Sequence, residues 1–126
     1  MRSVYIAAAD ASSFPMPDAD PLDRSGHGSH VSGTVAGLGV NLDGSTYAGP
    51  WDGALDATAL KIGPGAAPGA QLYALKVFGD GGGSTGLSAL AVEWATDPNG
   101  DGDFSDHLDV VNLSLGSAYG SPTDTE

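Results

Sequence analysis

The 126-residue chain contains no cysteine, and only 4 lysine and arginine residues stand against 16 aspartates and glutamates. Without cysteine, neither disulfide bonds nor thiolate metal sites can stabilise the fold. The formal net charge of -12 repels phosphate backbones and anionic lipid, so we expect neither nucleic acid nor a membrane surface as a partner. No apolar run approaches the length of a membrane span. The length is typical of one domain with a modest core.

A secretory signal is also missing from the start of the chain, because "MRSVYIAAADASS" is short and soon acidic. Either the protein is cytoplasmic or its true N-terminus lies upstream of Met1. The composition does not indicate an oligomeric state.

Glycine (20 residues) and proline (8 residues) are abundant and clustered, which predicts long irregular segments. We expect an irregular loop over Ser12–Ser25, followed by a helix of small residues from Gly26 to about Leu38. Gly33 and Gly37 on this helix would let another backbone approach closely. Gly39–Gly69 is expected to be an insertion with little regular structure.

The second half of the chain reads as strand, helix, strand. Apolar runs predict buried strands over Ala70–Phe78 and Leu108–Leu115. Between them, "LSALAVEWATD" predicts a helix whose apolar face comprises Leu87, Leu90, Ala91 and Trp94. A crossover of this length implies parallel strands in a right-handed connection and a sheet covered on both faces, the α/β class. Two strands and two helices do not complete such a sheet, so we expect the chain to be part of a larger fold.

The segment "GHGSHVSGTVAG", Gly26–Gly37, places two histidines at the start of the predicted helix. An imidazole there can project into a cleft and act as a general base, because its ordinary pKa lies near neutral pH. His27 and His30 partly share one helix face, so a metal site is an alternative. Metalloprotease helices, however, space their histidines i, i+4 around a glutamate, and neither feature is present.

The same segment closely resembles the block around the catalytic histidine of the subtilisin-like serine proteases (subtilases, peptidase family S8), usually H-G-T-H-V-A-G-T. Two further blocks follow in the family's order. "GAAPGAQLYALKVF" resembles its G-V-A-P segment and the next strand, and "SALAVEWATD" with "DVVNLSLG" resembles the helix and strand before the substrate cleft. The resemblance implies that residues 1–126 are part of a doubly wound, mostly parallel sheet with helices on both faces, with an insertion at about 39–69.

Carried over to this sequence, the resemblance implies that His27 is the catalytic base and that His30 is structural, with its ring hydrogen-bonded within the fold. It also implies two substrate-binding segments, which would bind an extended peptide between them by backbone hydrogen bonds. These segments comprise Gly81, Gly82, Gly83, Ser114, Leu115 and Gly116. By the same resemblance the parent protein is expected to be extracellular.

Two of the three triad members are not found in the chain. Asp10 follows an apolar run but lacks the family's D-[ST]-G pattern and lies too close to His27 in sequence. The nucleophile motif G-T-S-M-A is absent, and no serine is placed on a comparable strand-to-helix turn. Since an acyl-enzyme needs a nucleophile, we expect this chain to be inactive alone and its parent to be a serine endopeptidase.

The acidic stretch "DPNGDGDFSDHLD" resembles part of a calcium-binding loop. The candidate ligands are Asp97, Asn99, Asp101, Asp103 and Asp106, with Asp109 as a further possibility. Gly102 would allow the sharp turn, but Leu108 stands where a bidentate glutamate is usual, and two flanking helices are not expected. We expect structural calcium here, against the alternative of a solvated acidic turn. The earlier "PDADPLD" is a weaker candidate for calcium, and we expect it to be a solvated loop that leads to the helix.

Two interpretations compete with the protease. In one, the chain is a non-catalytic calcium-binding module or a decayed protease, and His27 has no role. In the other, His27 and His30 belong to a small metalloenzyme. A serine motif encoded downstream of Glu126 would favour the protease.

Overall fold

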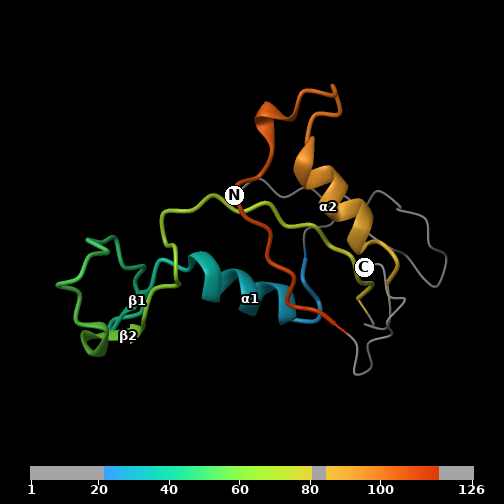
Figure 1. Cartoon of the computed structure of the whole chain (residues 1–126). Helices are drawn as coiled ribbons and strands as arrows, with labels where there is room; N and C mark the ends of the chain where they lie inside the picture. Colours follow the sequence, from blue (N-terminus) through green and yellow to red (C-terminus); the bar gives the residue numbers. More distant parts are fainter. Residues whose placement is uncertain (1–21, 81–84, 117–126) are drawn as a thin grey trace. The chain divides into compact units, whose positions relative to one another are not determined.

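A computed structural model of the chain describes residues 22–80 and 85–116 (Figure 1). These residues divide into two compact units, the first comprising residues 22–74 and the second residues 75–80 and 85–116. Each unit is described by itself. Among the described residues, no helix is long and apolar enough to cross a membrane.

The first unit begins with helix α1, His27–Ala36, so the helix predicted over 26–38 is confirmed with slightly shorter bounds. Gly26 precedes it with φ 82°, a left-handed conformation that glycine adopts without steric cost. None of the helix residues is buried. Packing of an apolar face therefore does not explain why this helix is stable.

The segment 65–67 is hydrogen-bonded to the C-terminal end of α1. The N–H groups of Gly65, Ala66 and Ala67 donate to the carbonyls of Gly37, Thr34 and Val35 at 2.8, 3.0 and 2.7 Å. These bonds satisfy carbonyls that have no partner within a helix's last turn. A Cβ at position 65 would lie 2.7 Å from the Gly33 carbonyl oxygen and 2.8 Å from the Gly37 nitrogen. The close backbone approach predicted at this helix is thus present, but the glycine that it requires is Gly65.

The stretch 39–69 is mostly irregular, as predicted, but it contains a small antiparallel sheet. Strand β1, Val40–Asn41, pairs with β2, Leu60–Ile62, and a 3-10 turn, η1, spans Ala57–Ala59. The Trp51 indole N–H donates to the Leu38 carbonyl at 2.9 Å, and the Trp51 ring meets Tyr47 edge to face. The Trp51 hydrogen bond connects the stretch 39–69 to the end of α1.

The second unit contains α2, Ser88–Thr96, which confirms the predicted helix. Its core consists of Val77, Leu87 and Ala91, with Leu75 and Phe78 packed against them. The buried face differs from the predicted one, since Ala95 is buried while Leu90 is 38% exposed. A second 3-10 turn, η2, spans Phe104–Asp106.

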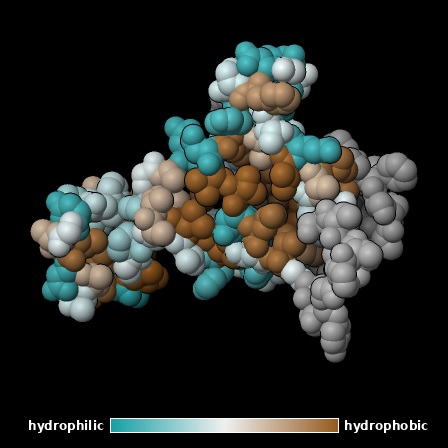
Figure 2. Space-filling view, in the orientation of Figure 1, coloured by the Kyte–Doolittle hydropathy of each residue, from teal (hydrophilic) through white to brown (hydrophobic). Residues whose placement is uncertain are grey.

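The structure does not show the two strands predicted over residues 70–78 and 108–115. Residues 70–78 contain only an isolated bridge position at Tyr73, and residues 108–115 contain no strand. Val110 is 83% exposed, and hydrophobic atoms lie at the molecular surface in Figure 2. A strand forms only when neighbouring strands satisfy its backbone, and two strands are seldom stable without more. The described residues therefore show a partial α/β fold with two helices and a two-stranded sheet.

Candidate functional site

His27 is the first residue of α1, and its side chain is exposed to solvent. The helix begins there because Gly26 turns the chain and its carbonyl accepts the first helical hydrogen bond, from the His30 N–H at 3.0 Å. An imidazole at this place can exchange protons with a group outside the helix.

The carboxylate of Asp23 binds the backbone on both sides of His27. Its Oδ1 accepts from the N–H groups of Ser25 and Gly26 at 3.1 and 2.8 Å. Its Oδ2 accepts from the Ser29 N–H at 2.6 Å. Because these donors stabilise the ionised form, they lower the pKa of Asp23 from 3.8 to about 2, with the backbone hydrogen bond from Ser29 as the largest cause.

Asp23 was missed as a functional candidate when "PDADPLD" was interpreted as a solvated loop. The structure shows that it satisfies donors at the start of α1, as a capping residue does, although it lies outside the usual capping position. The signal was an aspartate shortly before a glycine and the first helical residue, in a helix whose own first turn contains no acidic residue.

His30 lies one turn after His27 and is also exposed. The structure shows no hydrogen bond of its ring to any other described residue, so its expected structural bond stays a prediction. Within residues 22–80 and 85–116, no three Asp, Glu or His side chains are placed to hold a metal ion. The metalloenzyme alternative therefore gains no support from the geometry around α1.

Of the two segments expected to bind substrate, the structure describes only the second. Gly81, Gly82 and Gly83 lie outside the described residues, as does Asp10. Ser114, Leu115 and Gly116 are exposed, and the Ser114 hydroxyl accepts a hydrogen bond from the Asn112 side chain at 2.9 Å. They belong to the second unit, whereas His27 belongs to the first.

The acidic loop after α2 is organised by side chains that cap its own backbone. The Asp97 carboxylate accepts from the Gly100 and Gly102 N–H groups at 2.8 and 2.9 Å. Asn99 and Asp101 each accept from the N–H two residues further on, at 2.9 and 2.8 Å. Gly100 and Gly102 have φ values of 73° and 82°. Asp103 caps η2 by accepting from the Ser105 N–H at 3.0 Å.

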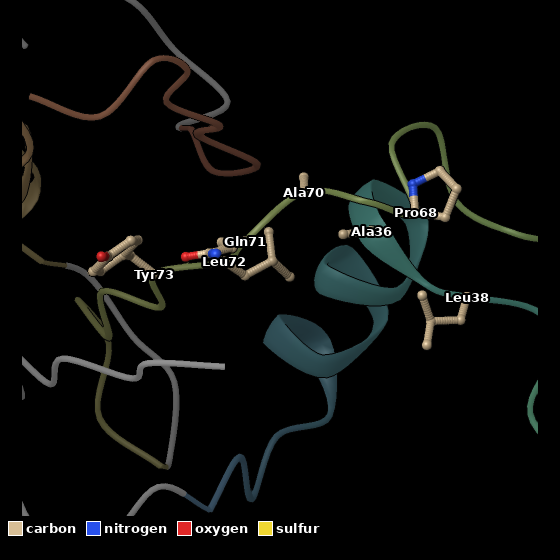
Figure 3. Close-up of a pocket in the computed structure, with 7 residues that line it drawn as sticks. All are labelled: Ala36, Leu38, Pro68, Ala70, Gln71, Leu72 and Tyr73. Carbon is tan, nitrogen blue, oxygen red and sulfur yellow. The ribbon is translucent and has the colours of Figure 1, made fainter. Parts of the chain in front are cut away.

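A concavity of about 500 Å³ lies beside the C-terminal end of α1 (Figure 3). It is lined by Ala36, Leu38, Pro68, Ala70, Gln71, Leu72 and Tyr73. Among the described residues that line it, Tyr73 carries the only acid–base group, and none carries a carboxylate, an imidazole or a serine hydroxyl.

Comparison of the sequence with known proteins gives one family model and several relatives that match most of the chain. A sequence model of the subtilase family matches residues 2–126. The thermostable alkaline protease of Halalkalibacterium halodurans is 34% identical over 119 residues, which are 94% of this chain and 26% of that protein. Subtilisin DY of Bacillus licheniformis is 38% identical over 117 residues, 92% of this chain and 33% of the relative. Subtilisin BL of Lederbergia lenta is 38% identical over 112 residues, 88% of this chain and 32% of the relative.

No solved structure gives a significant match. The chain spans only a quarter to a third of the length of these relatives. The family match, in contrast, extends over nearly all of this chain and includes the block that opens α1 with His27. The chain belongs to the subtilase family.

Proposed function

We propose that the protein to which this chain belongs is a serine endopeptidase and that His27 is its general base. The observation that carries the proposal is the exposed imidazole at the first position of α1, inside the histidine block of a chain that matches the subtilase family. In this role His27 takes a proton from a serine hydroxyl supplied by the rest of the protein and returns it to the leaving amine.

The remaining parts of the domain follow from the same proposal. Residues 1–126 form part of a peptidase domain with an insertion at about 39–69, and residues 70–78 and 108–115 become strands of a doubly wound sheet. Gly81–Gly83 and Ser114–Gly116 bind an extended peptide by backbone hydrogen bonds. Exposed apolar residues at 110, 111, 113 and 115 support a buried sheet position in the complete domain. The parent protein is extracellular under this proposal.

The acidic loop is proposed to bind calcium as a structural ion. Support comes from oxygen side chains at Asp97, Asn99 and Asp101 and from the two glycines in left-handed conformations. Asp103, which now accepts from the Ser105 N–H, and Asp106 would complete the ligand set. Calorimetry on the intact protein tests this: calcium should bind, and Asp97→Ala with Asp101→Ala should abolish binding at this site. Unchanged calcium binding in that variant would reject the loop as the site.

Peptide hydrolysis by the intact protein tests the proposed function. His27→Ala should lower kcat about a thousandfold or more, because the general base is lost. His30→Ala is the matched control on the same helix and should retain most of the activity. Equal activity of wild-type protein and His27→Ala would contradict the proposal, and so would the absence of any hydrolysis by the wild-type protein.

A further inference from the structure

We infer that Asp23 is a positioning residue for His27: its carboxylate fixes the junction between the preceding loop and α1 and thereby sets the direction in which the imidazole leaves the helix. The inference rests on the proposed function, since it assigns Asp23 a part in catalysis through His27. It concerns a side chain that contacts the backbone around the base and leaves the reacting atoms to other groups.

The contacts of Asp23 surround His27 in the sequence. One oxygen binds the Gly26 N–H, directly before the histidine, and the other binds the Ser29 N–H, two residues after it. An added Cβ at Gly28 would lie 3.5 Å from Asp23 Oδ2, so the carboxylate also lies against the residue that follows His27. The backbone of His27 is therefore held between two anchored N–H groups.

This anchoring matters because, among the residues that the structure describes, little else restrains the first turn of α1. No residue of the helix is buried, and the His27 ring has no hydrogen bond to another described residue. Gly26, with φ 82°, belongs to the residue type with the greatest backbone freedom. Hydrogen bonds from N–H groups to an ionised carboxylate are stronger than those between neutral groups. Because the pKa of Asp23 is low, its carboxylate is ionised at any pH at which a neutral imidazole can act as a base.

A role for Asp23 as the acid of a catalytic triad fits the structure less well. Both carboxylate oxygens already accept from backbone N–H groups, and no hydrogen bond joins Asp23 to the His27 ring. A purely stabilising role predicts a different outcome from positioning. Loss of stability lowers the number of folded molecules, whereas a displaced base lowers the turnover of each folded molecule.

The test compares variants of the intact protease, with kcat expressed per active site as counted by an irreversible serine-directed inhibitor. Asp23→Ala should lower kcat per site about tenfold or more while KM changes by less than about twofold, because small displacements of a catalytic group are costly. Asp23→Asn retains an acceptor for Ser25 and Gly26 but presents an N–H₂ group to Ser29, so its kcat should lie between those of wild type and Asp23→Ala.

Asp43→Ala is the matched control. Asp43 is an exposed aspartate whose Oδ1 accepts from the Ser45 N–H and hydroxyl at 2.9 and 2.7 Å, and these bonds likewise lower its pKa. It makes no contribution to the start of α1, so its removal should leave kcat and KM unchanged.

A kcat per site for Asp23→Ala within about threefold of wild type would overturn the inference, as would an equal loss in Asp43→Ala. If Asp23→Ala yields no folded protein, Asp23→Asn decides the question by the same criterion. Failure of the proposed function has a different signature, namely a wild-type protein that neither reacts with the inhibitor nor hydrolyses peptide.

Discussion

Helix α1 contains no buried residue and depends on hydrogen bonds at both of its ends, whereas α2 buries Ala91 and Ala95 and lacks a side-chain cap. At α1, Asp23 binds the first turn and residues 65–67 bind the last. At α2, the apolar core around Leu87 stabilises the helix instead. The difference shows that α1 leaves its side chains, including His27, available to other groups while its backbone is held in place.

The largest expected effect is on α2. Leu87→Ala removes the side chain directly before α2, which at 1% exposure is the most buried among the described residues, and should lower the free energy of unfolding of the intact protein by about 3 kcal/mol. Leu90→Ala, at a 38% exposed position of the same helix, should cost less than about 1 kcal/mol. Urea denaturation measures both. Similar costs for the two variants would show that α2 is not stabilised by the described core.

The next effect concerns the C-terminal end of α1. Gly65→Ala would place a methyl group against the Gly33 carbonyl and the Gly37 nitrogen, and we expect a loss of about 2 kcal/mol in unfolding free energy. Gly69→Ala is the control, because a Cβ there meets no atom within 4 Å. Thermal denaturation compares the two. Equal melting temperatures would mean that the hydrogen bonds of residues 65–67 do not hold the helix.

A smaller effect is expected at Trp51. Trp51→Phe removes the indole N–H that donates to the Leu38 carbonyl just beyond α1, and should cost about 1 kcal/mol. Tyr47→Phe, which removes a hydroxyl that donates to the Pro50 carbonyl within the stretch 39–69, provides the comparison for amide exchange at the end of α1. Faster exchange at this end in Tyr47→Phe but not in Trp51→Phe would contradict the assignment.

The smallest effect is the acid sensitivity of the α1 N-terminus. Because the pKa of Asp23 is about 2 in the folded chain and 3.8 ordinarily, its stabilisation is present above pH 3.8 and is lost as the pH falls towards 2. Amide exchange at Gly26 and Ser29 should therefore accelerate in this range beyond the change at Ala91 of α2. Asp23→Asn should abolish the difference. Parallel loss of protection in both helices would reject a local cap.

The sequence predicted both helices because their periodicity and their small residues are local properties. The histidine block also predicted the place of His27 at a helix start, which the structure confirms. The strands over 70–78 and 108–115 were predicted from apolar runs and from the family resemblance, and strand formation depends on partner strands that neither of these specifies.

The contacts around α1 were predicted only in part. Close backbone approach at the helix was expected from Gly33 and Gly37. A Cβ at Gly33 would meet no atom within 4 Å, whereas one at Gly37 would lie 2.5 Å from the Gly33 carbonyl oxygen of its own turn, and Gly65 makes the approach from another segment. The hydrogen bond between Asp23 and Ser29 joins residues six positions apart, and it depends on a turn at Gly26. The sequence pattern did not predict this turn. Roles for Gly81–Gly83 and for the calcium loop remain predictions.

Labelling of the intact protein with a fluorophosphonate tests the central claim, that His27 serves as the base for a serine in another part of the protein. The account predicts rapid labelling of one serine outside residues 1–126, slowed about a thousandfold or more by His27→Ala and little changed by His30→Ala. Labelling of a serine within residues 1–126, or a rate that does not depend on His27, would contradict it.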